Sequence, residues 1–118
     1  MPNSRYLEAD VIVRDEEGIH ERPSEAIMAI SQITTHEVYI SNGDKKIRPS
    51  SIYGILGLLA FQGTKLHLTV GEGPHSKQCL DMLVEAIQDP KLTEHFGEYI
   101  FIANNLRGKY NSEAIKSN

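Results

Sequence analysis

The sequence predicts an α+β domain in which helices cover one side of an antiparallel sheet. Residues 6–14 and 65–70 alternate apolar and polar side chains with the period of a half-buried strand. A third apolar segment ends at Asn42-Gly43, the dipeptide most favoured in two-residue hairpin turns. Three other segments repeat apolar residues at helical spacing, so each has one apolar face. These patterns leave the strand order open, and a ferredoxin-like arrangement also fits them.

The chain is expected to begin with a strand, a turn and a helix. The strand covers residues 6–14, and Gly18 allows a sharp reversal after it. Pro23 suits the first turn of a helix, because its missing N–H would have no intrahelical partner there. Apolar residues at helical spacing then predict a helix over residues 21–32. His20 is therefore expected at or just before the helix N-terminus.

A hairpin and a second helix are expected next. The hairpin strands cover residues 37–41 and 45–48 around the Asn42-Gly43 turn, and Pro49 stops the second strand. Either of two neighbouring serines, Ser50 or Ser51, can cap the helix that follows. The apolar stripe of this helix is expected to face the core and consists of Ile52, Ile55, Leu56 and Leu59.

The strand over residues 65–70 and a third helix complete the expected domain. Alternation along this strand directs His67 away from the core. Pro74 is expected to open the third helix, and Asp89-Pro90 to end it. The apolar face of this helix consists of Leu80, Leu83, Val84 and Ile87.

Composition excludes several classes of function. The 118 residues, 40% of them hydrophobic, are enough for one core. A net charge of −4 gives no electrostatic footprint for nucleic acid. No apolar run approaches the roughly 20 residues that a membrane span needs, so membrane insertion is not expected. The single cysteine, Cys79, indicates a small buried side chain in a reducing compartment, and we expect a cytoplasmic protein.

No cofactor is expected. The glycine-containing segments match no nucleotide-binding fingerprint. The five histidines are scattered without the spacing of a ligand set, and no metal site is predicted. They are His20, His36, His67, His75 and His95.

The position of His20 has chemical consequences. Free N–H groups and the positive end of the dipole make a helix N-terminus a site for anions such as phosphate. Arg22 adds a guanidinium that can hold phosphate oxygens. Imidazole is a nucleophile at neutral pH, so a reversible phosphohistidine at His20 is one hypothesis. The alternative from position alone is a partly exposed histidine that only caps a helix.

Three blocks of the sequence carry a family resemblance. Gly18-Ile19-His20-Glu21-Arg22-Pro23 resembles the active-site loop of the histidine-containing phosphocarrier protein (HPr) family of the bacterial phosphoenolpyruvate-dependent sugar phosphotransferase system. Residues 51–58 resemble the regulatory-serine helix of that family, and Gln62-Gly63-Thr64 with the strand after it resembles the next turn and strand. The three blocks keep the family's order and spacing over residues 6–88.

The resemblance implies an HPr-like open-faced β-sandwich of β-α-β-β-α-β-α order, a four-stranded antiparallel sheet covered on one side by three helices. This domain is expected to span residues 1–90. The implied function is a phosphocarrier whose His20 accepts a phosphoryl group from a phosphoenolpyruvate-dependent enzyme I and passes it to a sugar-specific acceptor protein. His20 and Arg22 are the implied catalytic residues, and the backbone of Glu21 and Arg22 with the Arg22 side chain is the implied phosphate site.

The second helix is implied to contact partners and to carry regulation. The implied partner contacts are Ile52, Tyr53 and Leu56, although Leu56 is as readily a core residue. Ser51 is the implied site of regulatory phosphorylation, which would add a serine kinase to the partners. The alternative for Ser50 or Ser51 is an ordinary helix N-cap.

The chain departs from the family in its acidic loop. Glu21 follows the histidine directly, where family members commonly have a small or hydroxyl residue. The carboxylates of the loop are expected at the solvated surface, and they are Asp15, Glu16, Glu17, Glu21 and Glu25. Their charge would oppose an incoming phosphoryl group. The acidic loop favours a second hypothesis, a regulatory protein-binding module of the same fold that acts without phosphoryl transfer.

Residues 91–118 extend beyond the family pattern and are expected to be partly ordered. Residues 99–103 with Leu106 are too apolar for a solvated linker. We therefore predict a short strand or helix within residues 92–106. This element docks either on its own domain or on a second copy of the chain, and the second case would give a homodimer. Residues 109–118 have few large apolar side chains and are expected to be mobile.

Overall fold

The computed structural model describes residues 5–116 and contains one four-stranded sheet. Its strands are β1 (Tyr6–Ile12), β2 (Val38–Asn42), β3 (Lys45–Ile47) and β4 (Lys65–Gly71). They lie in the order β1-β4-β2-β3, and all neighbouring strands are antiparallel. Leu68 of the central strand β4 pairs with Ala9 of β1 on one side and with Ile40 of β2 on the other. This arrangement provides the strand order that periodicity left open.

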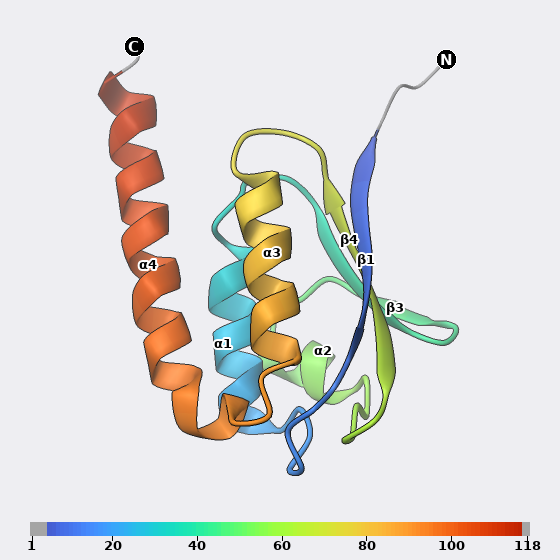
Figure 1. Cartoon of the computed structure of the whole chain (residues 1–118). Coiled ribbons are helices and arrows are strands. Elements are labelled where there is room, and N and C mark those ends of the chain that lie inside the picture. Colours follow the sequence, from blue (N-terminus) through green and yellow to red (C-terminus); the bar gives the residue numbers. More distant parts are fainter. Residues whose placement is uncertain (1–4, 117–118) are drawn as a thin grey trace.

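Helices cover one face of this sheet (Figure 1). They are α1 (Glu21–Ser31), α2 (Ile52–Leu56) and α3 (Ser76–Ile87). The expected open-faced α+β sandwich with three helices is therefore confirmed. A fourth helix, α4 (Leu92–Lys116), packs chiefly on α1 and touches α3, so it forms a further layer on the side away from the sheet (Figure 1).

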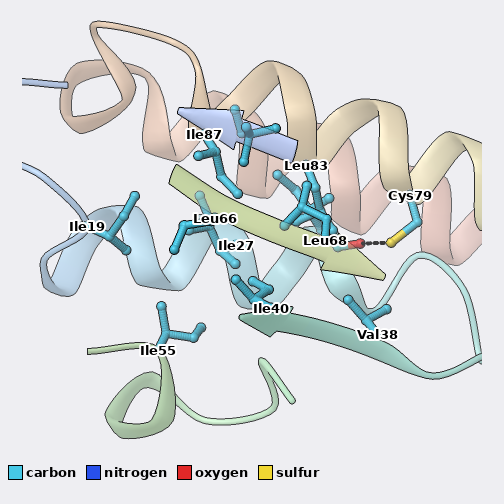
Figure 2. Close-up of a cluster of buried hydrophobic side chains, with 14 of the residues drawn as sticks. Ile19, Ile27, Val38, Ile40, Ile55, Leu66, Leu68, Cys79, Leu83 and Ile87 are labelled. Carbon is cyan, nitrogen blue, oxygen red and sulfur yellow. Dashed lines mark hydrogen bonds between the residues drawn. The ribbon is translucent and has the colours of Figure 1, made fainter. Parts of the chain in front are cut away.

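The core lies between the sheet and the first three helices (Figure 2). Alternate residues of β4, Leu66, Leu68 and Val70, are almost fully buried. Cys79 lies in this core and donates a 3.3 Å hydrogen bond from Sγ to the carbonyl of Ile30. Burial raises the pKa of the Cys79 thiol to about 12, so the sulfur remains protonated at neutral pH.

The hairpin turn lies one residue later than expected. Asn42 pairs with Lys45, so the two loop residues are Gly43 and Asp44 rather than Asn42 and Gly43. Gly43 has a φ of +60°, which the first loop residue of a tight hairpin requires. Asn42 stays in the strand, where its Nδ2 donates a 2.8 Å hydrogen bond to the Leu58 carbonyl.

The prediction that the apolar stripe of the second helix faces the core is wrong at the last residue of the stripe, Leu59. Leu59 is 65% exposed, and Leu58 is buried in its place. The stripe assumed two full turns, whereas α2 ends at Leu56 and Leu59 takes a left-handed φ of +52°. The change of conformation turns Leu59 outward.

The third helix also differs in detail. It begins at Ser76 rather than at Pro74, and His75 precedes it with a left-handed φ of +65°. Val84 is only half-buried, because the helix turns Cys79 and Ala86 into the core along with Leu80, Leu83 and Ile87.

The element predicted within residues 92–106 is a helix, and it docks on its own domain. Apolar residues of α4 that bury or half-bury their side chains toward the core mostly recur at a spacing of three or four, and they are Leu92, Phe96, Tyr99, Ile100, Ala103, Leu106 and Tyr110. The expectation that the chain is mobile from residue 109 is wrong for residues 109–116, which continue the helix. The His75 ring stacks on Tyr110, with centroids 3.3 Å apart, and fixes this part of α4. Residues 117 and 118 lie outside the described part.

The open face of the sheet carries a charged cluster around His67. Its Nδ1 lies 2.8 Å from Asp10 Oδ1, and its Nε2 lies 2.7 Å from Glu8 Oε1. Hydrogen bonds with Asp10 and Glu8 raise the pKa of His67 above its ordinary 6.5. The hydrogen bond with His67 lowers the pKa of Asp10 below its ordinary 3.8.

These shifts predict a pH-dependent contribution to stability. The His67 contribution is complete below pH 6.5 and is lost as pH rises through its higher folded pKa. The Asp10 contribution is present above pH 3.8 and is lost as pH falls through its lower folded pKa. We expect His67→Gln to lower the melting temperature most near about pH 5 and least near about pH 9. Asp10→Asn should show the same profile in thermal melts. An equal loss for His67→Gln at both pH values would contradict this prediction.

Candidate functional site

The loop before α1 is held by hydrogen bonds to the segment that follows α2. Ile19 N–H donates to the Ala60 carbonyl over 2.9 Å, and Val13 exchanges backbone hydrogen bonds with Gly63 and Thr64. Gly18 has a φ of +71°, and a Cβ there would lie 2.8 Å from the Ala60 carbonyl oxygen. Only glycine satisfies both the backbone conformation and this close approach. The loop therefore presents His20 in a fixed position.

We expect Gly18→Ala to be more destabilising than Gly43→Ala. Both residues have a positive φ, but a Cβ at Gly43 meets nothing within 4 Å. Gly43→Ala should cost about 1–2 kcal/mol of backbone strain. Gly18→Ala adds the contact with Ala60, worth a further roughly 1–3 kcal/mol. Urea unfolding of the two variants measures the difference, and equal losses would show that the close approach has no energetic effect.

His20 is the residue that precedes α1, as expected from the sequence. Its backbone is extended, with φ −101°, and its carbonyl accepts hydrogen bonds from the Ser24 N–H and hydroxyl. Its side chain is 37% exposed, so the ring is open to a partner. Because Pro23 has no N–H, the donors that the first turn of α1 offers to an anion beside His20 are those of Glu21 and Arg22.

The imidazole of His20 contacts α4 through one nitrogen. Its Nε2 lies 3.1 Å from Oγ1 of Thr93, in the first turn of α4. Glu17 Oε1 lies 3.9 Å from the same nitrogen. In Figure 1 the loop before α1 and the start of α4 lie at the same end of the molecule.

The expectation that Asp15 lies at the solvated surface with the other carboxylates of the acidic loop is wrong. Asp15 is 3% exposed, and its two oxygens accept hydrogen bonds from Glu17 N–H at 2.8 Å and Thr93 N–H at 2.7 Å. Burial acts to raise the pKa of Asp15, but the hydrogen bonds from Thr93 and Glu17 and the nearby His20 bring it below its ordinary value. Asp15 therefore stays charged beside the His20 loop. Glu16, Glu17 and Glu21 are exposed and Glu25 is half-buried.

Arg22 is exposed on the first turn of α1, and its guanidinium carbon lies 5.8 Å from the centre of the Phe96 ring. This cation–π contact joins the expected phosphate-binding side chain to α4. Both side chains expected to act on phosphate, His20 and Arg22, are thus in contact with the extension.

The second helix places its predicted residues in different environments. Ser51 is its N-cap, and its Oγ accepts a 3.0 Å hydrogen bond from Gly54 N–H. Tyr53 is 86% exposed, whereas Ile52 and Leu56 are half-buried.

Two further apolar residues lie beside the His20 loop. Leu59 and Phe61, each 65% exposed, flank Ala60, whose carbonyl binds the loop at Ile19. With Tyr53 on α2, they place three large exposed side chains within residues 53–61, which lead into the segment that supports the loop. Exposed apolar residues grouped in this way are typical of a protein-contact surface. Leu59 was missed from the sequence because its spacing matched a core stripe.

Sequence reasoning also missed the contacts made by Asp15 and Thr93. The Asp15-Glu16-Glu17-Gly18 segment contains a signal, because an aspartate often binds the N–H two residues later in a turn. Thr93 carried no signal, since its partners His20 and Asp15 are more than seventy residues away.

Residues 5–116 contain no group of three or more His, Cys, Asp or Glu side chains placed to hold a metal ion. Among the same residues, no helix has both the length and the apolar character for a membrane span.

Comparison with known proteins identifies the domain. A family model described as the phosphorylation site of the PTS HPr component matches residues 7–89. A structure of the phosphocarrier protein HPr from Bacillus anthracis is similar, with a TM-score of 0.65 and 23% identity, over 70% of this chain and 98% of that one. A structure of HPr-C-His from Thermoanaerobacter tengcongensis has a TM-score of 0.63 and 24% identity, over 70% of this chain and 91% of that one.

A histidine-containing phosphocarrier protein from Mycoplasma has a TM-score of 0.60 and 18% identity, over 65% of this chain and 86% of that one. These solved structures establish the fold. The family match covers well over half of the sequence and includes His20, Arg22 and Ser51. Beyond residue 89 the chain continues into α4. The chain therefore belongs to the HPr family of the phosphotransferase system, whose general role is that of a phosphocarrier.

Proposed function

We propose that His20 accepts a phosphoryl group from a phosphoenolpyruvate-dependent enzyme I and passes it to a sugar-specific acceptor protein. The observation that supports this most strongly is the position of His20. Its imidazole is open to solvent, directly before the N-terminus of α1, within the region that matches the family. The proposed place of action is the cytoplasm, where the free buried Cys79 would remain reduced.

The transfer needs a nucleophile for phosphorus and hydrogen-bond donors for the three phosphoryl oxygens. In the proposed step a lone pair of the His20 ring forms a bond to phosphorus while the bond between phosphorus and the donor breaks. The N–H groups of Glu21 and Arg22 and the positive end of the α1 dipole favour the added negative charge. The Arg22 guanidinium is the proposed side-chain clamp. The half-exposed position keeps the phosphoramidate accessible to the acceptor.

The donor and the acceptor are proposed to dock on the same apolar surface. This surface consists of Ile52, Tyr53, Leu56, Leu59 and Phe61. Its exposed side chains, Tyr53 above all, can bury apolar area at about 25 cal/mol per Å² on contact with a partner. Sharing one surface would make donor and acceptor compete, as a carrier requires.

Phosphorylation with phosphoenolpyruvate and a purified enzyme I tests the proposal. The chain should gain a label that is lost in acid and kept in alkali, as expected of a phosphoramidate, and should lose it to an acceptor protein. A label that survives acid, or no label with an enzyme I that phosphorylates another HPr in the same assay, would contradict it.

We also propose that a serine kinase phosphorylates Ser51 to weaken donor docking. A phosphate there would be favoured by the N-terminus of α2 but would place a charge of roughly −1.5 to −2 beside Tyr53 and Ile52. We expect Ser51→Asp to slow phosphoryl transfer to His20. Ser51→Ala, which removes the cap and costs about 1 kcal/mol, is the matched control and should leave the rate near that of the unchanged protein. Equal rates for Ser51→Asp and Ser51→Ala would count against the switch.

A second function is favoured by the contacts of α4. Thr93 and Phe96 engage the two side chains expected to act on phosphate, which fits a regulatory module that binds proteins without transferring phosphate. The two functions differ in two outcomes. A regulatory module would bind a partner protein with the same affinity whether His20 is intact or replaced by alanine, and it would not pass label to an acceptor.

A further inference from the structure

Thr93 connects the His20 loop with α4, although the two are far apart in the sequence. It belongs to the first turn of α4, outside the part of the chain that matches the family. Its Oγ1 lies 3.1 Å from His20 Nε2, and its N–H donates to Asp15 Oδ2 over 2.7 Å. The extension therefore supplies a side chain to the His20 site.

The start of α4 is held in place independently of His20. Asp89, in the connection between α3 and α4, accepts hydrogen bonds from Lys91 N–H at 2.8 Å and from the Tyr99 hydroxyl at 2.9 Å. Its Oδ2 also lies 2.7 Å from His95 Nδ1. Leu92, the residue before Thr93, is fully buried. These contacts fix Thr93 where its hydroxyl reaches the imidazole.

The Asp15 carboxylate favours one direction for the proton of the Thr93 hydroxyl. A charged carboxylate only accepts hydrogen bonds, and Asp15 Oδ2 accepts one from the Thr93 N–H, so its negative charge lies beside the Thr93 hydroxyl and attracts the hydroxyl proton. When the hydroxyl proton is directed to Asp15, the oxygen offers a lone pair to His20. The hydrogen bond with the imidazole then requires that Nε2 carries the proton.

We propose that Thr93 is a positioning residue of the phosphoryl-carrying site, which holds His20 in the tautomer with Nε2–H directed at Thr93 and the Nδ1 lone pair free to attack phosphorus. This inference rests on the proposed phosphocarrier function. It assigns part of that function to α4, which lies beyond the residues that match the family.

The proton and charge balance of the step follow from this geometry. The lone pair of Nδ1 forms the bond to phosphorus, and the pair that joined phosphorus to the donor leaves with the donor. Nε2 keeps its proton, so the ring gains positive charge. The Thr93 hydroxyl oxygen, which accepts from Nε2–H, and the Asp15 carboxylate beside Thr93 stabilise this charge without a proton transfer. Thr93 thus acts through His20 and does not touch the phosphoryl group.

The tautomer of His20 can be measured in the full-length protein without any phosphoryl donor. Long-range proton–nitrogen NMR spectra of the protein with ¹⁵N-labelled histidine report which ring nitrogen carries the proton. At alkaline pH we expect His20 to be almost entirely the Nε2–H form. In Thr93→Val, which keeps the shape but loses the hydroxyl, the ratio should move toward that of His20 in the urea-unfolded chain. Thr93→Ser should keep the ratio of the unchanged protein.

Phosphorylation rates provide the second measurement. Loss of one hydrogen bond to a developing charge should slow labelling of Thr93→Val by about tenfold to a hundredfold. Thr93→Ser, which keeps the hydroxyl, should retain most of the rate of the unchanged protein. If Thr93→Val and Thr93→Ser have the same melting temperature, a purely structural role of α4 would predict equal rates for the two variants. Glu17→Gln is the control for the other group near Nε2 and should leave the tautomer unchanged.

The outcomes separate this inference from the carrier function. If Thr93→Val retains both the tautomer and the rate, or if Glu17→Gln alone changes the tautomer, the role of Thr93 is overturned while the carrier function stands. A different result is that the tautomer depends on Thr93 but the unchanged protein takes no label from a competent enzyme I. The proposed carrier function then fails, while the effect of Thr93 on the tautomer of His20 stands.

Discussion

Replacing His20 by alanine should abolish acid-labile phosphorylation of the chain. The imidazole is the only nucleophile of the proposed step, and the α1 N-terminus beside it cannot accept a phosphoryl group covalently. No label above background is expected after incubation with phosphoenolpyruvate and an enzyme I. The measurement is the amount of label that acid removes from the purified protein. Undiminished labelling of His20→Ala would contradict the proposed function.

The matched controls for His20→Ala are another histidine and the neighbouring arginine. His67 is also partly exposed, but it lies on the open face of the sheet between two carboxylates, so His67→Ala should keep full labelling. Arg22→Ala should leave a slower reaction, by about tenfold to a hundredfold, because a charged hydrogen bond of roughly 1.5–3 kcal/mol is lost. An Arg22→Ala rate equal to that of the unchanged protein would remove Arg22 from the phosphate site.

Removal of α4 should have the second large effect, a loss of stability. Truncation after Pro90 removes the buried Leu92, Tyr99 and Ala103 and uncovers the side of α1 on which α4 packs. We expect the melting temperature to fall by roughly 10 °C or more, since each kcal/mol shifts it by several degrees in a domain of this size. The truncated chain should also expose new apolar surface, which light scattering would detect as association.

Two aromatic residues on α4 provide a sharper version of this test. Tyr99 is 8% exposed and bonds Asp89, whereas Phe101 is 68% exposed on the outer side of the same helix. Tyr99→Ala should cost about 3–5 kcal/mol, and Phe101→Ala only about 0.5 kcal/mol or less. If Phe101 and its neighbour Ile102 instead form a homodimer contact, Phe101→Ala would lower the molecular mass measured by light scattering. Equal stability losses for the two variants would contradict the docking of α4 through its Tyr99 side.

The elements with long, regular patterns could be predicted from the sequence. The alternation in β1 and β4 and the apolar stripes of α1 and α3 gave the right type of element, because each buries one face over at least two periods. The short α2 did not follow its pattern, since one and a half turns cannot carry a stripe as far as Leu59. The strand order came from the family resemblance, because pairing between distant strands leaves no local signal.

The His20 site was predictable only in its local part. The position of His20 before a helix follows from the change of period and from Pro23, both close in sequence. The burial of Asp15 could not be predicted, because a carboxylate in an acidic turn is usually solvated and its partner Thr93 lies on another element. The uninterrupted apolar run at residues 99–103 likewise fits a strand or a helix, and only the packing of α4 on α1 decides between them.

Nuclear magnetic resonance of the phosphorylated protein tests most directly whether His20 carries the phosphoryl group. The full-length chain with ¹⁵N-labelled histidine is phosphorylated by enzyme I and phosphoenolpyruvate, and its ³¹P and ¹⁵N spectra are recorded before the label decays. We predict one phosphoramidate resonance coupled to Nδ1 of His20, with the proton retained on Nε2. A phosphorus signal coupled to another histidine, or a phosphate ester on a hydroxyl side chain with the His20 resonances unchanged, would contradict the assignment of His20 as the carrier.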